Sequence, residues 1–461
     1  MKKISKITRK KAREHLGQLN LSCELAKIIR HCFPGLVTLL KQAPDPRSQS
    51  YTTYPGVVLL MTRILSSVFY ISSMRKTSEE FNSDTVIENI WELCGKEQTV
   101  MELPYWETIN RYLEKLDHNS LQEKVHGLRR RLISSRTFGN ARIRGKYWQV
   151  IIDGTGLYST RAETDEKCPY RIHNKGTEKE YRENYCYALE AKLVLHPGVP
   201  VSIMTEFIEN VDMPETGKQD CERKACWRLM ERLKKEFPRL RVCLNADSLY
   251  ACGRFFTECR KKHWHYILRF KEGGIPTAGE EYRSLQKIQQ NGWEEGCEEA
   301  VYRYDYVTGI DYKGNRINLA AYGETRERKI QKGIGKGTTK QEKKEFWFIT
   351  NLPVSRKNVK SVIERGRMRW KIENEGFNTQ KNHGYHLEHR YSKNYHAYKN
   401  HYYLIQIGHM ISQIMEVYEK LWKGMKQSRE QKHRRILEPF KTVRPREYSE
   451  ELEVMFQIRF Q

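Results

Sequence analysis

The sequence has no long hydrophobic run. Its most apolar segment, Val57 to Ile71, is interrupted by Arg63 and is shorter than the roughly 20 residues that a transmembrane helix needs. The basic N-terminus is not followed by the apolar core of a signal peptide. We therefore expect a buried helix at Val57 to Ile71 and no membrane partner.

The eleven cysteines include no CxxC pair, the spacing that many structural zinc sites use. Structural zinc is therefore not expected. In a chain without a secretion signal, an odd number of cysteines is typical of reduced thiols in the cytosol. The sequence thus predicts a cytoplasmic protein.

Acidic residues are few relative to basic ones. The chain carries 82 Lys and Arg against 57 Asp and Glu, a formal net charge of +25. That balance favours a polyanionic partner, and nucleic acid is the usual one. At 461 residues, with 38% hydrophobic residues, the chain is long enough for two or three domains with a substantial core.

Residues 1–140 carry apolar residues at three-to-four spacing and predict a helical N-terminal domain. Thr108 to Asp117 forms one of these helices and carries Arg111 and Lys115. It is either a DNA-reading helix or an ordinary packing helix. We assign DNA binding to this domain on its charge.

Residues 145–272 predict an α/β fold. The run YWQVIIDG indicates a buried strand that ends at Asp153, and an irregular charged loop follows over Arg161 to Asn184. NYCYALEAKLVL and VPVSIMTEFI, separated by HPG, predict a hairpin. Cys221 to Phe237 predicts an amphipathic helix, and LRVCLNAD predicts a strand that ends at Asp247.

A further helix and the strand HWHYILRFK complete this segment. The predicted order of elements is that of a ribonuclease-H-like mixed sheet with flanking helices. It consists of three strands, a helix, an acid-bearing strand, a further helix and a further strand. Residues 273–344 interrupt it with predicted antiparallel β structure and a Lys- and Gly-rich loop. Residues 345–423 return to the core with C-terminal helices, and 424–461 form a basic tail.

The segment Arg365 to Lys381, RGRMRWKIENEGFNTQK, predicts a helix with Arg369 and Glu373 on one face. By themselves these two residues are also consistent with a surface salt bridge. Asp153 alone is consistent with a turn residue, and Asp247 alone with a helix N-cap.

Three segments, IIDGTG, LNADSLYA and RWKIENEGF, resemble in that order the acidic motifs of DDE transposases from bacterial insertion sequences. The resemblance covers roughly residues 145–405 and is nearest to the branch marked by a tyrosine–arginine–glutamate–lysine signature. It implies a nucleoid-associated bacterial enzyme that performs cut-and-paste transposition. Such an enzyme nicks the terminal inverted repeats of its element in double-stranded DNA, forms a hairpin intermediate and transfers the strand to target DNA. Synapsis of two ends implies a homodimer.

The resemblance implies that Asp153, Asp247 and Glu373 are the catalytic acids and hold two Mg²⁺ or Mn²⁺ ions. Carboxylate oxygens are the ligands that these hard cations prefer. Two such ions activate a water and stabilise the leaving 3′ oxygen in phosphodiester cleavage.

Arg369 and Lys381 match phosphate-contacting residues of the signature. The sequence departs from it at Gly366, where the tyrosine belongs, and at Gln380, where the lysine belongs. In a regular α-helix the eight-residue step from Glu373 to Lys381 corresponds to a rotation of about 800°. Lys381 would therefore lie about 80° away from the helix face that carries Glu373. A one-residue π-bulge near Gly376 restores it, so we predict a bulge or break between Asn374 and Asn378.

Lys371 and Arg367 are substitute phosphate contacts, and Trp293 is a candidate for holding a flipped base, as an aromatic does in this branch. Two other features are weaker. Asp220 is a rival acid at a helix start, and the evenly spaced histidines His383, His386 and His389 suggest a metal cluster.

Two other functions remain open. One is a ribonuclease-H-like DNA nuclease without strand transfer, and the other is a non-catalytic DNA-binding transposase relic.

Overall fold

The structure is a computed structural model that describes most of the chain. The described residues are 21, 24–71, 73–134, 138, 141–196, 199–211, 219–297, 300–329, 339–418 and 428–444. The basic N-terminus, most of the predicted Lys- and Gly-rich loop and the end of the basic tail lie outside them.

Within the described residues, ten strands form one mixed sheet in the order β2-β3-β1-β5-β6-β10-β9-β8-β7, with β4 paired to β3. β1 is antiparallel to β3 and parallel to β5, β5 is parallel to β6, and β10 is antiparallel to β6. The strands are β1 (Trp148–Thr160), β2 (Tyr170–His173), β3 (Tyr181–His196), β4 (Val199–Phe207), β5 (Val242–Ala246), β6 (His265–Phe270), β7 (Trp293–Cys297), β8 (Ala300–Tyr312), β9 (Asn315–Lys329) and β10 (Thr339–Thr350).

The strands predicted for the centre of the sheet are present, and their burial explains their sequences. All five residues of β5 are buried, as expected of a central strand covered on both faces, and all nine residues of β4, which pairs only with β3, are buried as well. The predicted hairpin of β3 and β4 is confirmed. The predicted irregular loop over Arg161 to Asn184 is wrong in part, because it contains β2 and the first residues of β3, paired with each other.

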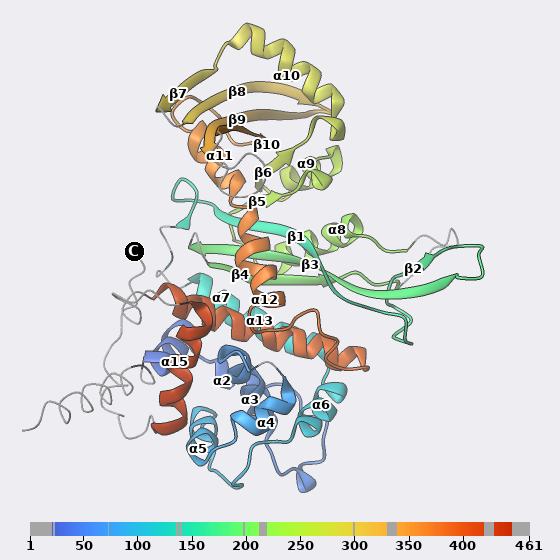
Figure 1. The fold of residues 1–461 in the computed structure, drawn as a ribbon, viewed down its shortest axis with the longest axis vertical. Helices are drawn as coiled ribbons and strands as arrows, with labels where there is room; N and C mark the ends of the chain where they lie inside the picture. Colours follow the sequence, from blue (N-terminus) through green and yellow to red (C-terminus); the bar gives the residue numbers. More distant parts are fainter. Residues whose placement is uncertain are drawn as a thin grey trace, which may run out of the picture.

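The inserted strands extend the core sheet rather than forming a separate one. β10 pairs with β9 along its whole length, and its last four residues pair with β6 (Figure 1). The hairpin turn predicted at DYKGN is confirmed, since Lys313 and Gly314 both have positive φ between β8 and β9. The insertion also contains a helix that we did not predict, α10 (Pro276–Gln289), whose Tyr282 hydroxyl donates to Asp305 on β8.

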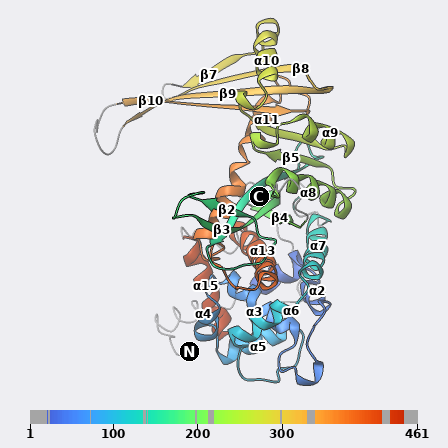
Figure 2. The same ribbon diagram turned by 90° about the vertical axis from the view of Figure 1, so that its right-hand side faces the viewer.

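Helices α8 and α9 flank the central strands, and the predicted amphipathic helix is confirmed as α8. Helices α10 and α11 lie beside β8, β9 and β10 at the top of Figures 1 and 2, whereas α2 to α7, α13 and α15 gather at the other end of the molecule. The helices are α2 (Leu36–Lys41), α3 (Gly56–Val68), α4 (Met74–Glu80), α5 (Asp84–Leu93), α6 (Trp106–Lys115), α7 (His118–Ser134), α8 (Glu222–Glu236), α9 (Gly253–Lys261), α10 (Pro276–Gln289), α11 (Val359–Arg367), α12 (Thr379–Asn382), α13 (Tyr395–Val417) and α15 (Arg429–Thr442).

Helix α13 joins the N-terminal helices to the sheet. It packs against α3, α6 and α7 on one side and β4 on the other, and most of its residues are buried. The Asn400 amide donates to the carbonyls of Leu113 and Leu116, and the Gln413 amide donates to that of Pro200. The N-terminal helices and the sheet therefore share one hydrophobic core. Among the described helices, none combines the length and apolar character that crossing a bilayer requires.

Part of the basic tail is folded, since residues 429–442 form α15 and pack against α5. The fully buried Asn89 of α5 donates through Nδ2 to the carbonyl oxygens of Phe440 and Val443, both at 2.8 Å. The Phe440 ring lies 5.0 Å from the Phe69 ring. The segment is basic, but its apolar positions and these two bonds fix it to the helical core.

Asn89→Ala should destabilise the protein by about 2 kcal/mol, because two buried carbonyl groups lose their donor. Urea unfolding measures the change. Arg434→Ala, on the exposed face of α15 and paired only with Glu430 in the described contacts, serves as control and should change stability little. Equal effects of the two substitutions would show that α15 is not held through Asn89.

Candidate active site

A pocket of about 420 Å³ lies where β1, β5 and the segment after α11 meet. Five residues predicted from the sequence line it, although they come from three distant parts of the chain. They are the three acids and two of the cations. The lining residues are Asp153, Gly154, Thr155, Gly156, Asp247, Arg369, Glu373, Phe377, Asn378 and Lys381.

The parallel pairing of β1 and β5 brings the first two acids together. Ile151 is the register partner of Asn245, so Asp153 and Asp247 stand two residues further along, at the same level. The predicted strand end at Asp153 is wrong, because β1 continues to Thr160 and Asp153 pairs with Glu190 of β3. Only β5 ends there, and this exposes the edge of β1 at the pocket.

Asp247 both caps a turn and lines the pocket. Its Oδ1 accepts hydrogen bonds from the Ser248 backbone N–H and from Ser248 Oγ, at the start of the 3₁₀ turn Ser248–Tyr250. The N-cap interpretation and the site interpretation therefore describe the same side chain. The cap fixes the carboxylate at the end of β5.

Arg369 binds Asp153 rather than Glu373. Its Nη1 lies 3.1 Å from Asp153 Oδ2, and both side chains are largely buried. Within the described residues no ion pair joins Arg369 to Glu373, so the surface salt bridge considered from the sequence is wrong. Glu373 is exposed at the pocket.

Asp153 and Asp247 have opposite pKa shifts. Burial raises the pKa of Asp153 to about 6, Arg369 opposes this, and the charges of Glu222 and Asp247 add to it. Burial also acts to raise the pKa of Asp247, but the Ser248 hydrogen bonds and the Arg369 charge outweigh it, so that pKa lies below its ordinary value. Arg369 thus stabilises the charged form of both carboxylates.

Polar side chains in two buried strands hold the helix that precedes this site. The Gln149 amide of β1 and the Asn245 amide of β5 donate to the Arg365 carbonyl at 2.7 and 2.6 Å, near the end of α11. Gly366 explains one departure from the signature. A Cβ there would lie 2.5 Å from the Phe348 ring, so a tyrosine does not fit unless Phe348 moves.

The predicted break in the third segment is confirmed. The helix is interrupted after Arg367, and Ile372–Asn378 is a π-helix, followed by α12. The turn of this π-helix is wider than that of an α-helix, and the Thr379 hydroxyl donates to the Asn374 carbonyl five residues earlier. The extra residue places Lys381 in the same pocket as Glu373.

A buried lysine that we did not predict lies under the π-helix. Lys192 of β3 donates through Nζ to Gln380 Oε1 at 3.4 Å and lies 5.1 Å from the Phe377 ring centre. A Cβ at Gly376 would lie 3.3 Å from Lys192 Nζ. Burial lowers the pKa of Lys192 to about 8, and the charge of Glu190 opposes this. Gln380, where the signature has lysine, is therefore an internal acceptor.

Glu222, at the start of α8, is a fourth acid beside Asp153 that we did not predict. It accepts hydrogen bonds from the hydroxyls of Tyr187 and Tyr250. A Cβ at Gly154 would lie 2.7 Å from Glu222 Oε2, so the glycine after Asp153 makes room for this carboxylate. No spacing in the sequence distinguished Glu222 from its neighbour Asp220, which instead binds Arg228.

The other predicted DNA contacts do not line the pocket. Trp293 stacks on Tyr304 with ring centres 5.3 Å apart. The guanidinium of Arg367 lies 5.2 Å from the rings of both Tyr322 and Phe346, and Lys371 pairs with Glu375. Their roles in DNA binding stay predictions.

The donor groups of the pocket are suitable for a divalent cation, but they are not gathered around one point. Nowhere in the described part of the chain are three His, Cys, Asp or Glu side chains close enough to hold an ion. The evenly spaced His383, His386 and His389 therefore form no such cluster with each other in this structure. At Asp153 the Arg369 guanidinium supplies the positive charge, as a cation would. Carboxylate oxygens are nevertheless the ligands that Mg²⁺ and Mn²⁺ prefer.

Two carboxylates on neighbouring parallel strands, with an arginine and a lysine beside them, are groups suited to binding a phosphodiester and its counter-cation. Residues 144–411 match the sequence model of the family described as "Transposase DDE domain". The chain belongs to this family.

No curated protein matches the chain. One solved structure, described as "Cryo-EM structure of piggyBac transposase synaptic complex with hairpin DNA (SNHP)", aligns with 93% of this chain and 82% of that chain. The alignment has 9% sequence identity and a TM-score of 0.41.

The raised pKa of Asp153 predicts a pH dependence of stability in the metal-free protein. Between the ordinary value of 3.8 and about 6, the folded state keeps a proton that the unfolded state has lost. The free energy of unfolding therefore falls as pH rises through this interval. Urea unfolding across the interval should show this fall in the wild type and a smaller one in Asp153→Asn. The exposed Asp311→Asn serves as control, and equal slopes in all three proteins would contradict the shift.

The position of Lys192 predicts that it stabilises the π-helix. Lys192→Met removes the donor to Gln380, and hydrogen exchange of the amides from Asn378 to Lys381 should accelerate roughly tenfold, as expected for the loss of one buried hydrogen bond. Exposed Lys235→Met should leave these amides unchanged. Unaltered protection in Lys192→Met would mean that the π-helix does not depend on Lys192.

Proposed function

We propose that this protein is a cut-and-paste DNA transposase of a bacterial insertion sequence, with Asp153, Asp247 and Glu373 as its catalytic acids. The observation that carries the proposal is the pocket that all three line together with Arg369 and Lys381. Family membership supports the transposase class. The net charge of +25 favours a double-stranded DNA substrate.

In this proposal Asp153, Asp247 and Glu373 would hold Mg²⁺ or Mn²⁺, and Arg369 pairs with Asp153 in the metal-free protein. The bound metal supplies activation of water and stabilisation of the leaving 3′ oxygen. Arg369 and Lys381 contact phosphates of the DNA backbone at the mouth of the pocket. Both cations position the scissile strand and carry no base specificity.

We also propose that the core is ribonuclease-H-like. The strand order β4-β3-β1-β5-β6, with three antiparallel strands followed by two parallel ones, supports this assignment. Under the same proposal the region up to residue 140 binds DNA, residues 273–344 are an insertion, and 345–423 complete the core. Two copies hold the two terminal inverted repeats, and strand transfer to target DNA follows through a hairpin intermediate.

Each of Asp153→Asn, Asp247→Asn and Glu373→Gln should lower cleavage of DNA carrying the element's ends at least about hundredfold, beyond the ~10–100-fold loss typical of residues outside the ligand shell. DNA binding, measured by fluorescence anisotropy, should persist because no phosphate contact is removed. Glu280→Gln, an exposed change on α10, should leave the cleavage rate unchanged.

Strand transfer is assayed separately from nicking with a pre-cut 3′-OH end. Nicking without strand transfer would indicate a nuclease instead, and DNA binding without either activity a transposase relic. Normal cleavage by any of the three variants would remove that residue from the site.

A further inference from the structure

A second cavity lies within the helical part of the protein, and we call it the helical cavity. It lies between α3, α4, α6, the segment before α13 and α13 itself, and it shares no lining residue with the acidic pocket. Its volume of about 580 Å³ is within the range of small-ligand sites, about 300–1,000 Å³. The lining residues are Arg63, Ser73, Met74, Trp106, Asn110, Glu114, Tyr385, His386, His389, Tyr391, Ser392, Lys393, Asn394 and His401.

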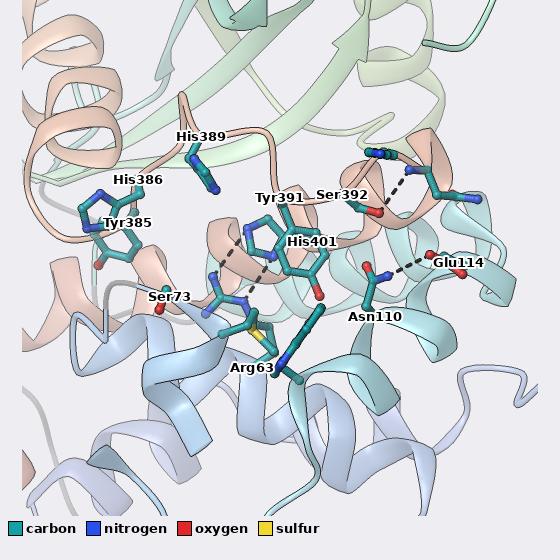
Figure 3. Close-up of a pocket in the computed structure, with 14 residues that line it drawn as sticks. Arg63, Ser73, Asn110, Glu114, Tyr385, His386, His389, Tyr391, Ser392 and His401 are labelled. Carbon is teal, nitrogen blue, oxygen red and sulfur yellow. Dashed lines mark hydrogen bonds between the residues drawn. The ribbon is translucent and has the colours of Figure 1, made fainter. Parts of the chain in front are cut away.

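One end of the helical cavity carries a buried positive charge. Arg63 is 5% exposed, and it donates to His401 Nδ1 at 3.2 Å and to Ser66 Oγ at 2.7 Å, both uncharged acceptors. Figure 3 shows Arg63 beside His401, with Tyr391 next to the same histidine. Burying a guanidinium without a carboxylate is unfavourable, and here burial lowers the pKa of Arg63 to about 10. An anion at this end would compensate that charge.

The cavity also has aromatic walls and unsatisfied polar atoms. The Asn110 Nδ2 group donates to Glu114 Oε1 at 2.8 Å, but within the described structure Asn110 Oδ1 and the Tyr391 hydroxyl have no hydrogen-bond partner although both atoms are buried. The Tyr391 ring is stacked on His401 at 3.7 Å, and Trp106 also lines the cavity. A flat ligand with polar edge atoms fits such a surface.

The lining of the cavity carries both signs of charge. Arg63 and Lys393 attract an anion, and Glu114 repels one. The ligand therefore combines an anionic group with a planar, hydrogen-bonding ring.

We propose that the helical cavity binds a single nucleotide, with its phosphate near Arg63 and its base near Tyr391 and Trp106. The nucleotide is either an unpaired unit of a DNA strand or a free mononucleotide, which share the same chemistry. If the nucleotide is part of a DNA strand, the inference rests on the proposed function. If it is a free mononucleotide, the inference does not depend on that function. The site itself is independent of the acidic pocket.

Calorimetric titration of the full-length protein with deoxyadenosine monophosphate, inorganic phosphate and deoxyadenosine tests the proposal. The nucleotide should bind at least about tenfold more tightly than either part alone, because it makes the contacts of both parts. Lys393→Gln and His389→Ala, both exposed and therefore tolerated by the fold, should each weaken nucleotide binding several-fold. Arg63→Gln should abolish it, with thermal unfolding reporting whether that variant is folded.

His383→Ala is the matched control, since this exposed histidine lies outside the cavity lining. Asp153→Asn distinguishes the two sites, because it should abolish DNA cleavage and leave nucleotide binding unchanged. Binding that is lost in Asp153→Asn but kept in Lys393→Gln and His389→Ala would place the nucleotide in the acidic pocket and overturn the proposal. Absence of nucleotide binding to the wild type would overturn it as well.

Oligonucleotides separate the two sources. If the nucleotide comes from a DNA strand, a duplex with an unpaired end should bind more tightly than the same duplex fully paired, and His389→Ala should remove the difference. Preference for the mononucleotide over both duplexes would indicate a free nucleotide. If neither DNA is cleaved but nucleotide binding persists, the transposase proposal fails and this one stands.

Discussion

The register between β1 and β5 is the constraint on which the acidic pocket depends. Ile151 lies opposite Asn245, and this one alignment brings Asp153 and Asp247 to the same level although 93 other residues separate them in the chain. The amides of Gln149 and Asn245 on the same two strands bind the Arg365 carbonyl. The strands therefore position both the first two acids and the helix end that leads to the third.

The position of the third acid, Glu373, depends on the packing and charge of the residues beneath the π-helix. The π-helix lies on a face of the sheet where Lys192, a buried ammonium, contacts Gly376, Phe377 and Gln380. Because Gln380 turns inward, Lys381 reaches the pocket. Buried polar groups of this kind contribute little net stability but specify one arrangement of the chain, since each alternative leaves an unpaired group.

Each cavity contains a buried or half-buried arginine. In the acidic pocket it lies beside a carboxylate expected to bind a cation, and in the helical cavity it lies where an anion is expected. Arg369 holds Asp153 in the acidic pocket, and Arg63 has only uncharged acceptors in the helical cavity. In the acidic pocket, Arg369 neutralises the candidate catalytic residue Asp153. In the helical cavity, the positive charge of Arg63 is available to a ligand. Basic side chains thus occupy specific internal positions as well as the surface of the protein.

The sequence alone predicted most of the strands, the amphipathic helix α8 and the hairpins, but not β2, because burial on a strand or helix leaves a local pattern and β2 is largely exposed. It also predicted the π-helix, since the spacing between Glu373 and Lys381 does not suit a regular α-helix. It did not predict Lys192, Glu222 or the docking of α15, nor the continuation of β1 past Asp153. These depend on contacts between segments far apart in the chain, where a buried lysine or carboxylate is defined by its partners and not by its neighbours in sequence. Only the tertiary structure decided them, because electrostatic pairing and close packing act through space.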